Sequence, residues 1–319
     1  MNASSYTAAS TLPSKLFCDD KLFSKIQKKE IIPIHIQLNP TNKCPLECSF
    51  CSCKNRDKNL EMDGDLLIEG VSRFISLGTK AVTITGGGDP LAYRSLDKLI
   101  NYLFYKGIKI GFVTNGVLFK DEHIDLFNKI TWCRISLSDE YRLLTPKLAS
   151  IIEAAHTDWS FSYVIKPDTD IRRIAEAVDF ANRHDFTHVR LVDDILSDLK
   201  DSSVDFLKTE LKKHVNDERV IYQGRKVYTR GHKRCLISLL KPNIGPDGKI
   251  YPCCGIQYAK DPPALDMKDS MGDLLNIEKI WSEQLNFDGS DCDRCYYSDY
   301  NNILNVIQDS QLLNHKEFV

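Results

Sequence analysis

Residues 34–51 read IHIQLNPTNKCPLECSFC, an apolar run followed by a loop that carries three thiols. The run Ile34–Leu38 is short and rich in β-branched residues, which predicts a buried strand. Cys44, Cys48 and Cys51 then follow with C-x3-C-x2-C spacing. Three thiolates do not close a tetrahedral metal site, but they can hold three irons of a [4Fe–4S] cluster and leave the fourth iron open for a ligand.

The three cysteines by themselves leave other interpretations open. A C-x2-C pair also suits structural zinc, and a disulfide loop or a chance grouping gives the same letters. The choice depends on what the rest of the chain places near this loop.

An alternation of short β-rich runs and amphipathic helical stretches extends from residue 34 to about residue 194. The helical stretches end at natural caps such as Gly78 and Gly107. Six βα units in succession imply parallel strands with right-handed crossovers, and they are too few for an eight-stranded barrel. The sequence therefore predicts an α/β fold with an open or partial barrel. Its expected strands are Ile34–Leu38, Ala81–Thr85, Lys109–Thr114, Trp132–Leu137, Phe161–Ile165 and His188–Val192.

Polar and glycine-rich residues follow these strands at their carboxyl ends, where parallel sheets place their chemistry. Gly86, Gly87 and Gly88 let the backbone approach a ligand closely, although a glycine turn after a strand also has a purely structural explanation. Thr114-Asn115-Gly116 fits a sharp strand-to-helix turn.

The cysteine spacing, the aromatic Phe50 before the third cysteine, the glycine triplet and Thr114-Asn115-Gly116 together resemble the radical S-adenosylmethionine (radical SAM) superfamily. The resemblance implies a partial (β/α)6 barrel of TIM type. It also implies that the open iron binds S-adenosylmethionine. One electron would cleave this cofactor, and a 5′-deoxyadenosyl radical would remove hydrogen from a substrate. An external one-electron reductant of flavodoxin or ferredoxin type is implied as a partner.

The resemblance also implies which residues contact the cofactor. Asp89 stands where the family usually has glutamate, one methylene longer, which puts its direct role in doubt. Ser136 and Ser138 are expected to bind the ribose or the carboxylate, or to be satisfied core hydroxyls. Lys166 and Arg190 are expected to meet the carboxylate, or to form structural ion pairs. The full expected set is Phe50, Gly86, Gly87, Gly88, Asp89, Thr114, Asn115, Ser136, Ser138, Lys166 and Arg190.

Acidic residues also gather at strand ends, namely Asp139, Glu140, Asp193 and Asp194. Carboxylates there could bind substrate or accept a proton, although acidic loop residues are usually only solvated. We take Asp193 as the candidate catalytic base.

A second set of cysteines lies in the last hundred residues. Four of them, Cys235, Cys253, Cys292 and Cys295, can close a metal site, either zinc or a [4Fe–4S] cluster. Beside a radical SAM barrel this set resembles the single-cluster form of the SPASM/Twitch auxiliary domain. The resemblance implies one auxiliary [4Fe–4S] cluster that accepts or relays an electron.

Cys254 is then surplus to the second set. A free cysteine is most often a small buried apolar residue. The sharper interpretation, taken from epimerases of the superfamily, is that Cys254 donates a hydrogen atom to a substrate radical. Cys253 and Cys254 could exchange roles, and Cys53 is a second candidate donor. We assign no role to Cys18 or Cys133.

Domain organisation follows from these patterns as residues 1–33 for an N-terminal extension with a helix, 34–221 for the barrel and 222–319 for the auxiliary-cluster domain with a C-terminal helix. The chain has 319 residues, 42% hydrophobic, with a net charge of −2. This balance disfavours a long nucleic acid as partner, and no apolar run is long enough for a membrane helix. Eleven cysteines in a chain without a secretory signal favour metal over disulfides, so we expect an oxygen-sensitive cytoplasmic protein.

Three functions are compatible with these observations. An oxidoreductase would dehydrogenate its substrate and pass an electron to the auxiliary cluster. A redox-neutral epimerase, of a peptide or of a sugar or aminoglycoside, would use Cys254 as the hydrogen donor. A zinc-bound scaffold is the non-enzymatic alternative. The substrate is expected to be a small molecule or a peptide.

Overall fold

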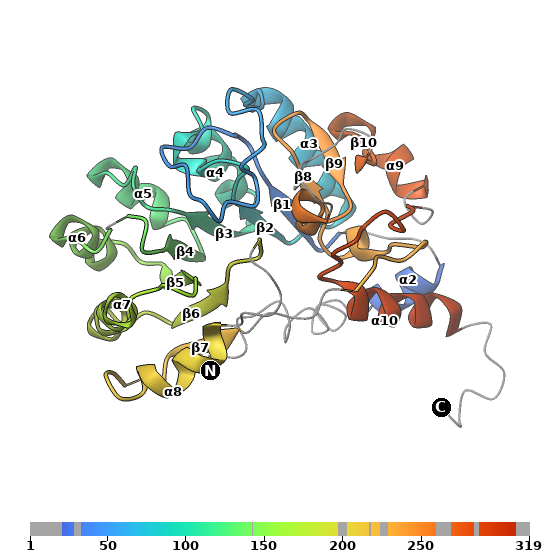
Figure 1. The fold of residues 1–319 in the computed structure, drawn as a ribbon. Coiled ribbons are helices and arrows are strands. Elements are labelled where there is room, and N and C mark those ends of the chain that lie inside the picture. The colour runs from blue at the N-terminus through green and yellow to red at the C-terminus, as the bar shows by residue number, and fades with distance from the viewer. Residues whose placement is uncertain are drawn as a thin grey trace.

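The computed structural model describes residues 21–28, 33–141, 143–196, 203–216, 218–223, 229–259, 269–283 and 287–310. Cys18 and most of the predicted N-terminal extension lie outside these ranges. The strands form one sheet in the order β10-β9-β8-β1-β2-β3-β4-β5-β6-β7 (Figure 1).

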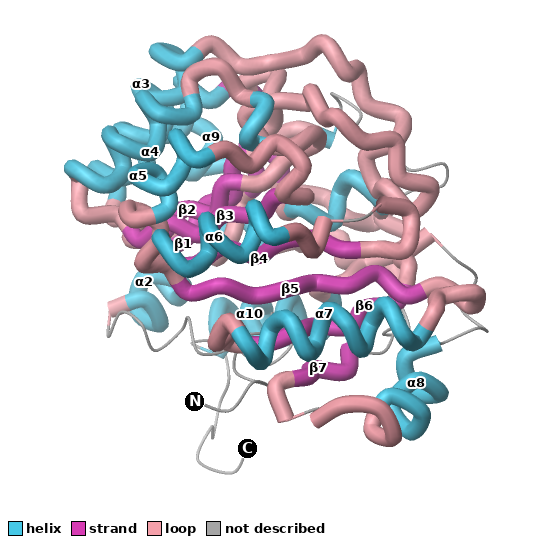
Figure 2. The backbone as a smooth tube through the Cα atoms, turned by 90° about the vertical axis from the view of Figure 1, so that its left-hand side faces the viewer, coloured by secondary structure: helices cyan, strands magenta, loops and turns pink. Residues whose placement is uncertain are grey.

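All six predicted strands are present and pair in parallel, in sequence order, as the prediction of a partial barrel requires. The curved sheet carries its helices on the outer face (Figures 1 and 2). The six strands are β1 (His35–Leu38), β2 (Ala81–Ile84), β3 (Lys109–Thr114), β4 (Trp132–Leu137), β5 (Asp158–Ile165) and β6 (His188–Asp193).

The outer helices bury their apolar faces against the sheet. Asp63 caps α3 by accepting hydrogen bonds from the backbone N–H groups of Asp65 and Leu66, and Gly78 ends this helix with φ of 113°. The helices of this layer are α3 (Gly64–Leu77), α4 (Leu96–Tyr105), α5 (Ile124–Phe127), α6 (Pro146–Ala154), α7 (Ile171–Arg183) and α8 (Ser203–Leu211).

The sheet extends beyond the six predicted strands at both edges. β7 (Val220–Gln223) adds to β6 and crosses the predicted domain boundary at residue 221. On the other side β8 (Asn243–Ile244) pairs in parallel with β1, and β9 (Lys249–Tyr251) and β10 (Gly272–Asp273) follow antiparallel. The C-terminal part thus continues the barrel sheet, and its division into a separate domain stays a prediction.

Two helices from opposite ends of the chain lie side by side at the base of this C-terminal part (Figure 1). They are α2 (Leu22–Lys28) and α10 (Ser298–Asp309), and Gln27 Nε2 donates to Ser310 Oγ at 2.8 Å. The remaining helix, α9 (Ile277–Glu283), packs on α3, where Trp281 meets Phe74 edge to face. Within the described residues, no helix has both the length and the apolarity to span a membrane.

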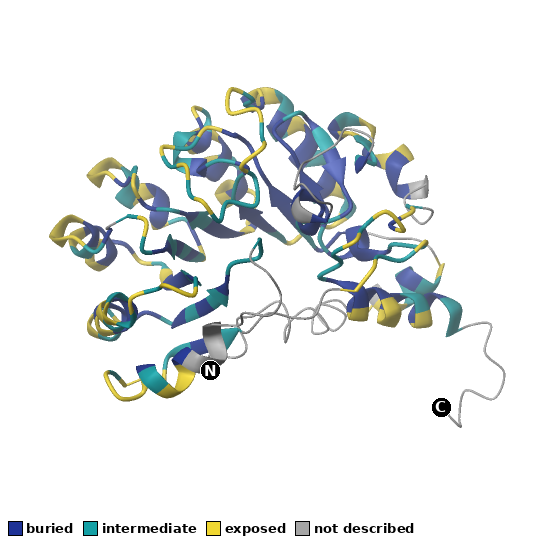
Figure 3. Ribbon diagram, in the orientation of Figure 1, coloured by how far each residue is buried: buried dark blue, intermediate teal, exposed yellow. Residues whose placement is uncertain are grey.

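The two faces of the barrel sheet differ in chemistry. On β4, Cys133, Ile135 and Leu137 are buried on one face, whereas Arg134 and Ser136 alternate with them on the other. The apolar face packs against the outer helices in the hydrophobic core (Figure 3). On β4 the inner face is therefore polar, and it ends at the cavity that the cysteine loop also lines.

Candidate active site

The cysteine loop between β1 and α3 is closed at its base by a short ladder. Asn42 N–H donates to Leu60 O at 2.9 Å and Met62 N–H donates to Pro40 O at 2.9 Å, on either side of an isolated bridge between Thr41 and Glu61. Glu61 is buried and pairs with Lys43 and Arg94. This base fixes both ends of the loop against the sheet.

The glycine turn after β2 packs directly against the start of this loop. Gly88 N–H donates to Thr41 O at 3.0 Å, and Asp89 N–H donates to Lys43 O at 2.8 Å. A Cβ atom at Gly88 would lie 2.1 Å from Lys43 O, so only glycine fits there. The close approach predicted for a ligand is thus, at Gly88, an approach of two backbone segments.

Asp89 joins this turn to the end of β3. Its carboxylate accepts from Thr114 Oγ1 at 2.8 and 3.0 Å, from Asn115 N–H at 2.7 Å and from Leu91 N–H at 2.9 Å. Burial raises the pKa of this carboxyl group, while the backbone and threonine donors act in the opposite direction. We infer that Asp89 positions its neighbours, since its oxygens are already engaged.

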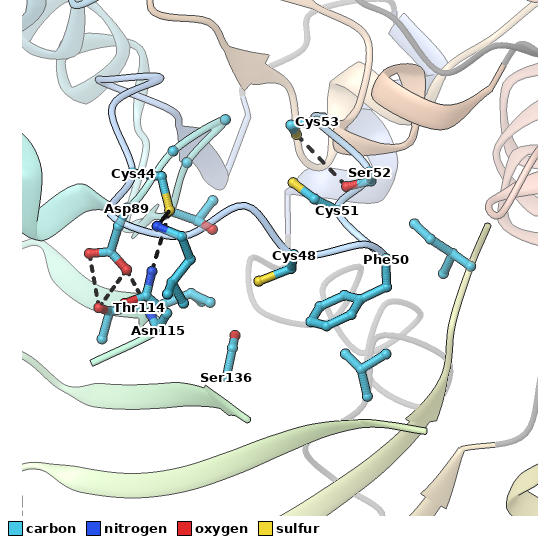
Figure 4. A pocket seen from close by; sticks show the side chains of 18 of the residues that line it. Cys44, Cys48, Phe50, Cys51, Ser52, Cys53, Asp89, Thr114, Asn115 and Ser136 are labelled. Atoms are coloured by element: carbon cyan, nitrogen blue, oxygen red, sulfur yellow. Dashed lines mark hydrogen bonds between the residues drawn. The ribbon is translucent and has the colours of Figure 1, made fainter. Parts of the chain in front are cut away.

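A cavity of about 290 Å³ opens between this assembly and the carboxyl ends of the strands. Figure 4 shows Cys44, Cys48 and Cys51 on the loop, with Asn115 and Ser136 facing them from the strand ends. Asn115 Nδ2 donates to Cys44 Sγ at 3.4 Å. The predicted residues that line the cavity are Cys44, Cys48, Phe50, Cys51, Gly86, Gly87, Gly88, Asp89, Thr114, Asn115, Ser136 and Asp193.

Three predicted cofactor contacts lie outside this cavity lining. Ser138 is buried and accepts from Glu140 N–H at 3.2 Å. Lys166 forms an ion pair with Glu140 at 3.0 Å, the structural alternative expected for it, and Glu140 also accepts from Ser49 N–H at 2.9 Å. Lys166 therefore supports the cysteine loop from β5 through Glu140.

Arg190 is the third. It extends from the inner face of β6 and donates from Nη2 to Ser162 Oγ at 3.0 Å. Its position is deeper in the barrel than the cavity, because it lies two residues before Val192, which lines the cavity.

Arg56 lines the cavity and was not predicted. Its guanidinium donates to Cys51 Sγ at 3.5 Å, and also to Asn42 O and Cys53 O, both at 2.9 Å. A hydrogen bond from Cys53 lowers the pKa of Cys51 to about 6, with the charge of Arg56 contributing. A cation beside a thiolate favours the form that binds iron. The only sequence signal was a basic residue five positions after Cys51.

The four cysteines of the second set line one pocket, together with Gly231 and Gly289. Backbone hydrogen bonds bring their segments together, including Gly231 N–H to Cys292 O at 2.8 Å and Cys295 N–H to Thr229 O at 2.8 Å. Cys254 does not line this pocket, and its Sγ lies 3.3 Å from Tyr297 Oη. The set Cys235, Cys253, Cys292 and Cys295 is thus the one that the fold assembles.

In the described ranges, no three His, Cys, Asp or Glu side chains converge at the spacing of a single metal ion. A [4Fe–4S] cluster is bound differently, because each thiolate ligates a different iron. Three thiols line the first cavity, where an arginine and an amide donate to the sulfurs, and four thiols line the second.

Two other cysteines are placed by the fold. Cys53 Sγ donates to Gln257 Oε1 at 2.6 Å and so ties the cysteine loop to the 3-10 turn Cys254–Tyr258. Cys133 is fully buried in β4, as expected for a wall residue without chemistry.

Comparison with known proteins bears on the class of protein to which this fold and this site correspond. The Radical SAM superfamily matches residues 38–140. A GTP 3',8-cyclase of Aquifex aeolicus is 26% identical over 297 residues, which cover 78% of this chain and 89% of that protein. A GTP 3',8-cyclase of Staphylococcus saprophyticus is 34% identical over 105 residues, 29% of this chain and 30% of the relative. The match to that relative therefore spans under a third of its length.

The fold is also shared with solved structures. Streptococcus suis SuiB bound to precursor peptide SuiA superposes with a TM-score of 0.60 at 17% identity, covering 88% of this chain and 75% of that one. The partial parallel barrel, whose strand ends meet a C-x3-C-x2-C loop, agrees with the family match, and a radical SAM domain implies a [4Fe–4S] cluster and S-adenosylmethionine. The chain thus contains a radical SAM domain, matched over residues 38–140.

Proposed function

We propose that this enzyme abstracts a hydrogen atom from a substrate C–H bond and oxidises the substrate with the help of an auxiliary [4Fe–4S] cluster. Cys44, Cys48 and Cys51 would hold the first cluster. When bound, that cluster supplies the electron that cleaves S-adenosylmethionine. Asn115 and Arg56 hydrogen-bond thiols of this set, and such outer contacts tune a cluster.

The observation that carries the proposal is the gathering of four cysteines in one pocket away from the first site. Cys235, Cys253, Cys292 and Cys295 would complete a closed auxiliary site, as in a SPASM/Twitch-like segment. The substrate then loses a hydrogen atom to the 5′-deoxyadenosyl radical, a proton to a base and one electron to the auxiliary cluster. Asp193, which is 7% exposed and lines the cofactor cavity, is our candidate for the base.

The alternative is a redox-neutral epimerase in which Cys254 returns a hydrogen atom to the substrate. Its support is the separation of Cys254 from the four-cysteine pocket and its contact with the hydroxyl of Tyr297. A thiol that ligates no iron is able to act as a donor.

The names of two relatives support the proposed classes of substrate. One is the GTP 3',8-cyclase already described. Another is a PqqA peptide cyclase of Bradyrhizobium diazoefficiens, 26% identical over 34% of this chain and 28% of that protein. We therefore propose a small molecule such as a nucleotide, or a peptide, as substrate. We further propose a cytoplasmic enzyme that is reduced by a flavodoxin or ferredoxin.

The two reactions are separated by the fate of solvent hydrogen. Anaerobically reconstituted enzyme is incubated in D2O with candidate nucleotides and peptides, and the product is analysed by mass spectrometry. An oxidised product without carbon-bound deuterium supports the oxidoreductase. Carbon-bound deuterium that disappears in Cys254→Ala supports the epimerase.

Cys53→Ala is the matched control for this variant, because Cys53 is the second candidate donor and contacts Gln257 beside the same turn. Loss of label in Cys53→Ala alone would assign the donor to Cys53. Protein that binds zinc but no iron, and that forms no 5′-deoxyadenosine, would overturn both reactions.

A further inference from the structure

The inner face of the barrel carries polar groups that the cofactor cavity does not use. Arg134 on β4 is in register with Ser160 on β5, which is in register with His188 on β6. The adjacent row joins Ser136, Ser162 and Arg190 across the same strands. Ser136 lines the cofactor cavity, so these rows run from that cavity into the barrel.

Several buried polar atoms on this face have no hydrogen-bonding partner in the described part of the chain. They include Arg134 Nε and Arg190 Nε, the side-chain amides of Asn39 and Asn243, and Gln223 Oε1. Alternation along β1, β4, β6, β7 and β8 places all five side chains on the inner face. Buried polar atoms usually have partners, so such a group suggests a polar ligand.

Lys241, just before β8, is electrostatically coupled to Arg134 and Arg190. Burial lowers the pKa of Arg134 to about 9 and also lowers those of Arg190 and Lys241, and the cations reinforce this in Arg134 and Lys241. No ion pair joins any of the three to a carboxylate among the described residues. Within the described ranges, the three cations therefore have no carboxylate counterion, and an anionic ligand would supply one.

Two of the three cations, Arg134 and Lys241, also interact electrostatically with Cys254. Its charge acts on both Lys241 and Arg134, and those of Tyr296 and Tyr297 act on Arg190. The group of Arg134, Arg190 and Lys241 therefore lies between the cofactor cavity, at Ser136, and the thiol of Cys254. A substrate that extends from the first thiol site to Cys254 would contact these three cations.

We propose that Arg134, Arg190 and Lys241 bind an oxyanion group of the substrate, a phosphate or a carboxylate, inside the barrel. The guanidinium fork matches both groups, and three cations favour a group with more than one negative charge. The binding role rests on the proposed function, because it assumes that a substrate enters the barrel between the two thiol sites.

The test uses anaerobically reconstituted enzyme and two probes, pyrophosphate and glutarate, titrated by calorimetry. Wild type should bind at least one of them, and the tighter probe identifies the group. Arg134→Gln and Lys241→Gln should each weaken that binding about tenfold or more. Arg172→Gln is the control, because Arg172 is an exposed arginine paired with Asp170 on α7.

Thermal unfolding without probe is a second measurement. If Arg134 only stabilised the fold, replacing it would lower the melting temperature. Arg134→Met removes a buried charge while keeping a long side chain, so the melting temperature should rise in the absence of anion. The shift that the tighter probe produces in wild type should disappear in this variant. A lower melting temperature with an unchanged probe shift, or probe binding equal in all variants, would overturn the proposal.

Iron content and 5′-deoxyadenosine formation without substrate keep this result separate from the proposed function. Both should be unchanged in the control Arg172→Gln, because the exposed Arg172 lines neither of the two thiol-lined cavities. Wild-type protein that lacks iron would instead contradict the proposed function. Normal iron content with no anion binding contradicts only the inference about the barrel interior.

Discussion

The carboxylate of Asp89 accepts a 2.7 Å hydrogen bond from the backbone N–H of Asn115, and so joins the glycine turn after β2 to the end of β3. The side chain of the same Asn115 donates to Cys44 Sγ. A buried carboxylate thus positions the residue whose side chain contacts Cys44. Asp89, which stands where the family usually has glutamate, therefore has a structural role in joining these two segments.

Replacing Asp89 should weaken the contact between the glycine turn and β3 and lower the free energy of unfolding. In Asp89→Ala, Thr114 Oγ1 and the N–H groups of Leu91 and Asn115 lose their acceptor. We expect a loss of about 3 kcal/mol or more in unfolding free energy, measured by chemical denaturation. Asp63→Ala is the control, since it removes an exposed helix cap and should cost only about 1 kcal/mol. Equal losses in the two variants would contradict the role assigned to Asp89.

Gly88 should tolerate no side chain, for a reason distinct from backbone strain. A Cβ there meets Lys43 O at 2.1 Å, so Gly88→Ala must displace the cysteine loop. We expect loss of about half the iron, that of the first site, with the second site retained. Gly107→Ala offers the comparison, because φ is +69° but nothing lies within 4 Å. That variant should lose about 1 kcal/mol of stability and no iron.

His188 should make the protein less stable as the pH falls. It is 4% exposed, and burial lowers its pKa to about 4, with the charges of Arg134 and Arg190 adding to the effect. The unfolded chain takes up this proton near pH 6.5, so stability is lost between about pH 6.5 and 4 and not above. The loss should reach up to about 3 kcal/mol at pH 4.

His188→Gln should flatten this part of the stability curve, measured by denaturation between pH 7.5 and 4.5. His156→Gln, at an exposed position after α6, is the control and should leave the curve unchanged. A wild-type slope that persists in His188→Gln would assign the pH dependence to other groups.

Periodicity and spacing predicted the six central strands and both cysteine sets, because strand period and ligand spacing are local properties of the chain. β7, β8, β9 and β10 were missed, since two to four residues carry too little pattern to indicate a strand. Lys166 was expected at the cofactor because it follows the end of a predicted strand. The sequence did not indicate that Glu140 is its ion-pair partner. The cation cluster of Arg134, Arg190 and Lys241 comes from three separate segments, and only the fold brings them together.

The central claim is that two separate thiol sets each bind a [4Fe–4S] cluster, with Cys253 and not Cys254 in the second set. The most direct measurement is the iron content of anaerobically reconstituted single and triple variants. We expect about eight irons per chain in wild type and in Cys254→Ala. We expect less iron in Cys253→Ala than in Cys254→Ala, and about four irons in Cys44→Ala/Cys48→Ala/Cys51→Ala. Iron lost in Cys254→Ala but kept in Cys253→Ala, or four irons in wild type, would contradict the account.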